Sequence, residues 1–301
     1  MSKKILAVYF TQSGQLGDII DSFTAPLIDS GAYVEKLQIQ PAKKFPFPWS
    51  TPVFFAAMPD SVLLVPTELE PFRLKETRYD LIILGFQPWF LSPSIPFSSL
   101  LQHPGFKQVL KDTAVVTISG CRNMWINAQE KNKKLLKAAG ANLAGNIALV
   151  DRHNNYASLV TILYWMLTGK KDRKWGIFPK PGVSEQDIAD ASVFGKTVSE
   201  HLAKENWIEL QPRLVEQKAV DVKYQYMFIE RKAGRIFLIW ANIISKKKKR
   251  SGWLVAFKYY LLIALCIAAP IILVVDAILF KPFLAKRIQR QKKYYSGVEL
   301  I

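Results

Sequence analysis

Five short apolar runs recur along the first 150 residues, and helix-like stretches separate them. The runs are Ile5–Phe10, Tyr33–Ile39, Leu81–Gly85, Ala114–Ile118 and Asn146–Val150. Uninterrupted apolar runs of this length are typical of strands that are buried on both faces of a parallel sheet. Their alternation with helices indicates right-handed βαβ units. The pattern therefore predicts an α/β fold with a doubly wound, parallel, five-stranded sheet.

Two helices are marked by their ends, and two segments exceed what such a sheet needs. Residues 127–139 are predicted to form a helix that ends at Gly140. Ser184 and Asp187 form a capping-box pattern at the start of a helix that runs to about Lys204. The insertion at 41–78 is rich in proline and aromatic residues, which disfavours a long helix. This insertion and a second one at 151–181 either wall a pocket or cover a sheet edge.

The C-terminal part has a different character. Trp253–Phe280 is apolar apart from Lys258 and Asp276, and basic stretches flank it at 246–250 and 281–293. An apolar run of this length is a candidate membrane segment, and flanking cations favour a lipid headgroup boundary. The sequence leaves two arrangements open: one spanning helix, or a hairpin that dips into one leaflet with both ends cytoplasmic.

These patterns divide the chain into four parts. We expect a sheet domain at 1–205, a basic helical linker at 206–250, an apolar membrane anchor at 251–285 and a basic tail at 286–301. The net charge is +17, and Lys246–Ile301 carries twelve Lys and Arg against two acids. We find no nucleic-acid motif, so membrane lipid is the expected partner of this charge. Cys121 and Cys266 fall in different segments, which favours free thiols in a reducing compartment. No metal site and no signal peptide are predicted.

The first strand leads into a loop suited to a phosphate group. Its residues are Thr11, Gln12, Ser13, Gly14, Gln15 and Leu16. Backbone amides and the N-terminus of the following helix favour an anion, and a glycine permits close approach. The loop has no lysine, which is not needed where amides form a nest.

Two further loops follow strands that are expected to end at the same edge. The first contains Gln87, Pro88, Trp89 and Phe90, and the second contains Ser119, Gly120, Cys121 and Asn123. Ligands in open α/β sheets lie beyond the carboxyl ends of the strands. We expect Trp89 to stack on a flat ring such as a flavin, and the backbone of the second loop to bind the polar edge of that ring. Cys121 is interpreted as a small packing residue rather than a reactive thiol.

With these loops the sequence resembles the flavodoxin and NAD(P)H-dependent FMN reductase superfamily over about residues 1–205. In that family the loop ends in a hydroxyl residue where this chain has Leu16, so one phosphate contact is missing. The resemblance implies a flavodoxin-like fold, FMN as cofactor and NAD(P)H as a possible reductant. The segments Phe45–Trp49, Cys121–Trp125 and Trp175–Gly182 resemble, more narrowly, the dialkylresorcinol condensing enzymes of flexirubin-type pigment pathways.

The narrower resemblance implies a membrane-tethered aromatase that oxidises the cyclohexane-dione product of a partner ketosynthase, with an acyl carrier as a further partner. His153 follows the last strand and is the candidate base, and Tyr156 is the second candidate. A lipophilic substrate fits a domain on the cytoplasmic face of a membrane. Two alternatives remain: a tethered flavodoxin that carries single electrons, and a flavin-free partner of a ketosynthase.

Overall fold

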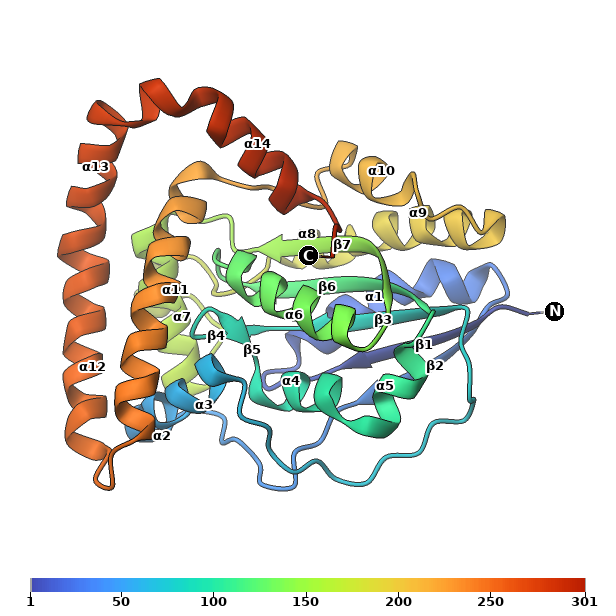
Figure 1. Cartoon of the computed structure of the whole chain (residues 1–301), viewed down its shortest axis with the longest axis horizontal. Coiled ribbons are helices and arrows are strands. Elements are labelled where there is room, and N and C mark those ends of the chain that lie inside the picture. The colour runs from blue at the N-terminus through green and yellow to red at the C-terminus, as the bar shows by residue number, and fades with distance from the viewer. Residues whose placement is uncertain (1, 301) are drawn as a thin grey trace.

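A five-stranded parallel sheet forms the centre of the computed structural model, which describes residues 2–300 (Figure 1). The strands are β1 (Lys4–Tyr9), β2 (Tyr33–Gln38), β3 (Leu81–Phe86), β6 (Ala114–Cys121) and β7 (Asn142–Val150). Each coincides with one of the predicted apolar runs. The expected α/β fold with a parallel five-stranded sheet is therefore confirmed.

The strands are arranged in the order β2-β1-β3-β6-β7. This is the flavodoxin-like doubly wound order, in which the direction of winding reverses between β1 and β3. The two connections leaving these strands go to opposite sides of the sheet, so a crevice opens at their carboxyl ends. The fold thus places the loops after β1, β3 and β6 at one edge.

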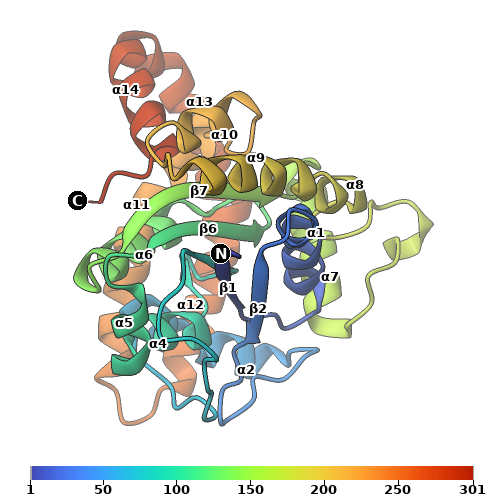
Figure 2. The ribbon, with the colours of Figure 1, turned by 90° about the vertical axis from the view of Figure 1, so that its right-hand side faces the viewer.

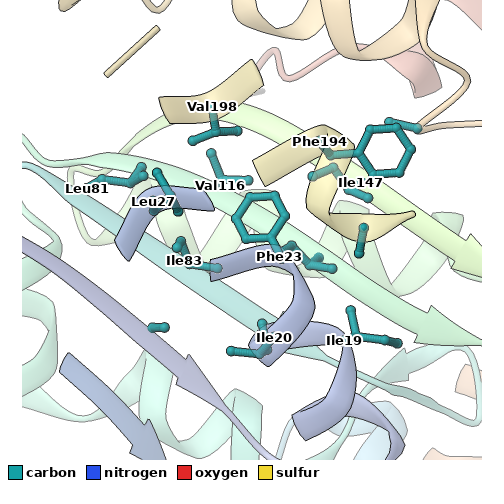
Figure 3. Packing of buried hydrophobic residues seen from close by; sticks show 14 of the residues in the cluster. Ile19, Ile20, Phe23, Leu27, Leu81, Ile83, Val116, Ile147, Phe194 and Val198 are labelled. Atoms are coloured by element: carbon teal, nitrogen blue, oxygen red, sulfur yellow. The ribbon is translucent and has the colours of Figure 1, made fainter. Parts of the chain in front are cut away.

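Helices cover both faces of the sheet (Figure 2). One face carries α1 (Gln15–Asp29), α8 (Glu185–Ala189), α9 (Ala191–Lys204) and α10 (Leu210–Glu216), and the other carries α4 (Ile95–Gln102), α5 (Pro104–Leu110) and α6 (Ile126–Ala138). On the first face, Ile20 and Phe23 of α1 pack between the strands and Val198 of α9 (Figure 3). Ser184 caps α8 by accepting a hydrogen bond from the amide of Asp187 at 3.0 Å, as the capping-box pattern predicts.

Both insertions contain short helices. The first forms α2 (Thr51–Ala56) and α3 (Met58–Leu63), each with proline in its first turn, so proline starts these helices rather than preventing them. The second forms α7 (Asn155–Thr168) and a 3₁₀ turn at Lys174–Gly176. The two insertions meet where the amide of Trp49 donates to the carbonyl of Met166 at 2.8 Å. The two insertions therefore pack against each other and do not cover separate edges of the sheet.

The sheet domain extends beyond residue 205, where the sequence interpretation ended it. Leu210 and Leu214 of α10 are fully buried in the core against β7, and Ala219 belongs to the same cluster. The predicted basic linker is therefore partly core. Its remainder is α11 (Tyr224–Ser245), which begins after Val220 and Val222 have packed against Trp125.

The apolar segment is one continuous helix that lies antiparallel to α11 (Figure 1). It consists of α12 (Ser251–Ile263), a π-helical turn at Ala264–Ala268 and α13 (Ala269–Leu279). The π-helical turn directly precedes Pro270, whose missing amide disturbs regular hydrogen bonding. Phe257 anchors the helix in a small core with Phe237 of α11 and Met58 of α3. By length and composition this is the one helix in residues 2–300 that is able to cross a membrane.

The tail after the apolar helix returns to the sheet domain. A 3₁₀ turn at Lys281–Leu284 leads into α14 (Ala285–Ser296). The hydroxyl of Tyr294 donates to Glu130 of α6 at 2.7 Å, and Gln211 donates to the carbonyl of Ser296 at 2.7 Å. Val298 and Leu300 then pack on the core beneath α6. The predicted basic tail is therefore a helix docked on the sheet domain, and both ends of the apolar helix lie at that domain.

The close packing of α1 on α9 gives a stability prediction. A Cβ at Gly195 would lie 2.0 Å from the carbonyl oxygen of Phe23, which is rigid helix backbone. We expect Gly195→Ala to push the two helices apart and to lower the free energy of unfolding by roughly 2–3 kcal/mol. Gly252→Ala is the matched control, because Gly252 has no atom within 4 Å of that position. Urea denaturation of the two variants measures the difference, and equal stability would contradict the packing described.

Candidate functional site

The loop after β1 presents unused amides at the start of a long helix. Gly14 has φ 90° and open space around its Cβ position, a backbone conformation that suits glycine. Its amide donates to the hydroxyl of Thr11 at 3.1 Å, which closes the loop. Among residues 2–300, no atom accepts a hydrogen bond from the amides of Gln12, Ser13, Gln15 or Leu16. These donors and the positive end of the α1 dipole form a nest for an anion.

The side chains of this loop have mostly structural roles. Gln12 accepts from the indole of Trp49 at 3.0 Å and donates to the carbonyl of Pro46 at 3.1 Å, which ties the first insertion to the loop. Gln15 makes two hydrogen bonds to the backbone of Val183. Leu16 packs into the core. Ser13 alone retains a free hydroxyl at the cavity, so the loop relies on backbone amides for anion binding.

The loop after β3 forms a tight hairpin. Strands β4 (Pro88–Trp89) and β5 (Ser92–Pro93) pair across Phe90 and Leu91, which have φ values of 47° and 60°. Turns with positive φ at both central residues normally use Asn or Gly, so two bulky residues here carry backbone strain. Strain of this kind concentrates at functional sites, where the surroundings over-determine it. Phe90 faces the cavity and also contacts Phe54, with ring centroids 4.7 Å apart.

Trp89 is not placed as an open stacking platform. Its ring makes edge contacts with Phe10, Phe45 and Trp49 at centroid distances of 5.8, 5.0 and 5.3 Å. It is 9% exposed and lines the cavity together with Trp49 of the first insertion. Stacking of Trp89 on a flat ligand remains a prediction, and these edge contacts would have to rearrange to free a face of the ring. Gln87 and Pro88 line the cavity as expected.

The end of β6 contributes Gly120 and Cys121 to the cavity, since the strand continues to Cys121, beyond the Ile118 expected from the sequence. Neighbouring residues act as supports. Ser119 is buried within the sheet, and Asn123 donates to the side chain of Asn155 at 2.8 Å. Burial raises the pKa of the Cys121 thiol well above its usual range. A neutral thiol is a poor nucleophile, which agrees with the packing role expected from the sequence.

Arg122 is a cavity residue that sequence reasoning did not select. Its guanidinium donates to Asn155 at 3.1 Å, and it forms no ion pair with any carboxylate in residues 2–300. Burial lowers the pKa of Arg122 from its ordinary value, but the side chain stays charged at neutral pH. The position of Arg122 directly after Cys121 was the only available signal. The structure thus adds a half-buried cation to the cavity wall.

The three loops meet around one cavity of about 190 Å³. Both insertions complete its wall, with Phe47, Trp49 and Phe54 from the first and Ile162, Trp165 and Met166 from the second. This confirms that the insertions form a pocket wall. The volume is below the roughly 300–1,000 Å³ of pockets that bury a small-molecule ligand. As it stands, the cavity is therefore smaller than a typical site for a ring-sized ligand.

His153 and Tyr156 lie outside the cavity wall. The Nδ1 atom of His153 is 2.7 Å from Asp151, whose other oxygen accepts from Ser158 at 2.7 Å. Asp151 is buried, and His153 is 43% exposed at its side chain. Tyr156 points to solvent with 51% exposure. A role for His153 as a base remains a prediction, and it would require movement of the segment between β7 and α7.

A buried acid on α11 supports the loop after β6. Glu230 accepts a hydrogen bond from the amide of Asn127 at 2.7 Å at the start of α6, where Trp125 offers no side-chain cap. Its second carboxyl oxygen has no partner among the described residues. Burial raises the pKa of Glu230 to about 8, and the hydrogen bonds from the backbone oppose this shift only in part. The capping group of α6 thus comes from the C-terminal region.

Solved structures with this fold include several flavoproteins. A flavoprotein in complex with FMN from Lactobacillus acidophilus is 17% identical, with 49% of this chain and 93% of that chain covered and a TM-score of 0.41. A putative flavoprotein from Bacteroides uniformis is 19% identical, with 55% and 99% covered and a TM-score of 0.37. Flavodoxin 2 from Bacillus cereus is 17% identical, with 67% and 99% covered and a TM-score of 0.34.

The flavodoxin-like fold class of this chain follows from the order of its own strands. A scan against protein-family models finds no match to this sequence. A search of curated proteins finds no significant match either.

The buried acid gives a pH prediction. The carboxyl of Glu230 holds its proton up to about pH 8 in the folded chain, whereas an ordinary glutamate loses it near pH 4.5. Its stabilising contribution is therefore complete below pH 4.5 and is lost as pH rises towards 8, by at most about 1.4 kcal/mol per unit. We expect Glu230→Gln to remove this slope. Urea unfolding of both proteins between pH 5 and pH 8 measures it, with exposed Glu209→Gln as control. Parallel curves for wild type and Glu230→Gln would contradict the assignment.

Proposed function

We propose that this protein is a membrane-associated oxidoreductase that binds FMN in the cavity at the carboxyl edge of its sheet. The observation that carries the proposal is the meeting of three strand-end loops around one cavity, with four free amides of the β1 loop at its base. In the flavodoxin-like strand order, the flavin belongs at this switch point. When bound, FMN supplies an acceptor for two electrons.

Different residues of the chain would bind the phosphate and the ring of FMN. The amides of Gln12, Ser13, Gln15 and Leu16 would hold the phosphate, so the missing hydroxyl at Leu16 removes one contact without removing the nest. Arg122 is the cation available to the polar edge of the ring. Phe47 and Trp165 would exclude water from the other side, with their ring centroids 6.3 Å apart in this conformation.

The aromatic wall supports a lipophilic substrate. Its rings run without interruption from Trp49 through Phe54 and Phe90 to Phe257 on the apolar helix, at centroid distances of 5.8, 4.7 and 6.4 Å. These contacts connect the cavity wall to the apolar helix through packed aromatic side chains, which favours an apolar substrate near that helix. A carrier of single electrons needs neither this wall nor the two insertions, so the enzyme is the favoured function. The domain would lie on the cytoplasmic face, where NAD(P)H is available.

Within this class, the resemblance to dialkylresorcinol condensing enzymes suggests the aromatisation of a cyclohexane-dione. That reaction removes a hydride and a proton from the ring, and an electron acceptor must then reoxidise the cofactor. The chain would orient the ring and accept the proton, for which His153 is the candidate, held by Asp151. A ketosynthase or an acyl carrier would deliver the precursor.

The first test is whether the purified protein contains bound flavin and how tightly it binds FMN. We expect purified full-length protein to show flavin absorbance bands and to bind FMN. Gly14→Ala should weaken FMN binding at least tenfold, because alanine disfavours φ near +90° and shifts the amides of the nest. Gly31→Ala is the matched control, since Gly31 has φ 88° and open space but lies after α1, away from the cavity.

Fluorescence titration of free FMN measures both variants. Absence of FMN binding by the wild type would refute the enzyme and the carrier and leave the flavin-free partner. Equal losses in the two glycine variants would show that backbone strain, and not the nest, explains the effect.

The second test is turnover. With a long-chain cyclohexane-dione in vesicles, we expect substrate-dependent reduction of the bound flavin by two electrons, and a loss of at least tenfold in the rate for His153→Ala. Tyr156→Phe should leave the rate unchanged, because Tyr156 points to solvent. Stopped-flow absorbance measures these rates. One-electron exchange with a redox protein and no reaction with the dione would favour the carrier, and an unchanged rate in His153→Ala would remove His153 from the mechanism.

A further inference from the structure

A second cavity lies between α11 and α14, on the opposite side of α11 from the buried Glu230. Its volume is about 270 Å³, and the cations on its wall are Arg231, Lys232, Arg235 and Arg287. Tyr224 and Phe228 form its apolar part. No acidic residue lines it. The nearest acid on the apolar helix, Asp276, accepts a hydrogen bond from Tyr224 at 2.8 Å.

The four cations have no protein partner. Within residues 2–300, none of them forms an ion pair or a side-chain hydrogen bond, and Lys232 alone lies over an aromatic ring, 4.9 Å from the centroid of Phe228. Arg231 is half-buried, and the other three are exposed. Unpaired like charges that share one groove repel each other and raise the free energy of the fold. Arginine presents a planar set of donors that matches the oxygens of a phosphate. The groove therefore has the charge and the donors for a phosphate group.

The surroundings of the groove are apolar. On one side of the groove, Leu284 follows the end of α13 along the chain. The residues just before it include three exposed apolar side chains: Leu279 (56% exposed), Phe280 (54%) and Phe283 (85%). On the other side Leu238 and Ile239 follow Arg235 by one turn of α11 and are also exposed. A site for a free, soluble phosphate compound gains nothing from such a border. A lipid offers a phosphate and acyl chains together.

The orientation of the apolar helix agrees with this ligand. The helix has 29 residues, about 43 Å at 1.5 Å per residue, and 6% of its most apolar window is buried. Arg250 lies 4.0 Å from Asp60 at the start of the helix, and α14 is docked on α6 after its end. With both ends held at one domain, the helix would lie along a membrane surface and would not cross it while α14 stays docked.

We propose that the groove between α11 and α14 binds the phosphate of an anionic phospholipid headgroup, with the acyl chains lying against the exposed residues of α13. The proposal rests on the membrane association in the proposed function but not on FMN. It adds a defined lipid site to what is otherwise a general attraction of basic residues to anionic membranes.

The test is binding of the full-length protein to vesicles of phosphatidylcholine alone or with 30% phosphatidylglycerol. We expect phosphatidylglycerol to raise partitioning of the wild type at least tenfold. The groove variant Arg231→Gln/Arg235→Gln/Arg287→Gln should lose most of this gain. The matched control is the loop variant Lys246→Gln/Lys248→Gln/Lys249→Gln, which removes the same charge between α11 and α12 and should lose less than threefold. Circular dichroism establishes that both variants fold.

Several outcomes would overturn the proposal. Equal losses in the groove and loop variants would mean that spread charge alone attracts the protein. Equal binding of the wild type to both vesicles would refute the lipid site and leave membrane association intact, whereas no binding to either would refute both. A rise in Tm with inorganic phosphate that needs the three arginines, without a gain from phosphatidylglycerol, would make the ligand a soluble phosphate. The flavin spectrum is independent of all these results.

Discussion

The constraint on which this molecule depends is the reversal of winding between β1 and β3 in a parallel sheet. Because all five strands run the same way, their following loops collect at one edge, and because the connections diverge there, that edge has an open crevice. The chain places its unusual features at this crevice: the free amides before α1, the strained hairpin at Phe90 and both insertions. The sheet positions these groups, and the insertions determine what can reach them.

Much of the fold could be predicted because its signals are local. Most of the strands are apolar runs that are buried on both faces, and the five predicted ranges agree with the five strands to within a few residues. The exception is β2 at the edge of the sheet, which Glu35, Lys36 and Gln38 interrupt. The domain boundary was misplaced because α10 gives no such signal: Leu210 and Leu214 become core residues only through contact with β7, about 65 positions earlier in the chain. The docking of α14 was missed for the same reason, since the Tyr294–Glu130 contact joins residues 164 positions apart.

In the candidate site, too, local features could be predicted and contacts between distant residues could not. The sequence identified the three loops, because each directly follows a strand, but not the directions of their side chains. Trp89 turns into an aromatic cluster since the first insertion folds over it, and Ser119 turns into the sheet. Trp165 was not predicted as a cavity residue because it lies in an apolar stretch without clear periodicity. Arg122 was not predicted because Cys121 beside it drew the functional interpretation. Such residues become visible only when segments distant in sequence are brought together.

The helical hairpin formed by α11 and the apolar helix (α12 and α13) contacts two of the three loops that form the cavity. Phe257 of the apolar helix packs on Phe90 in the loop after β3, and Glu230 of α11 caps the helix that follows the loop after β6. A movement of the hairpin relative to the sheet must therefore break an aromatic contact and expose or uncap a buried carboxyl, both of which cost free energy. A surface that holds the exposed apolar face of α12 and α13 would therefore also hold the helices that contact these two loops. The helices α11 and α12, which lie outside the sheet domain, thus help to hold the loops of the candidate site in place.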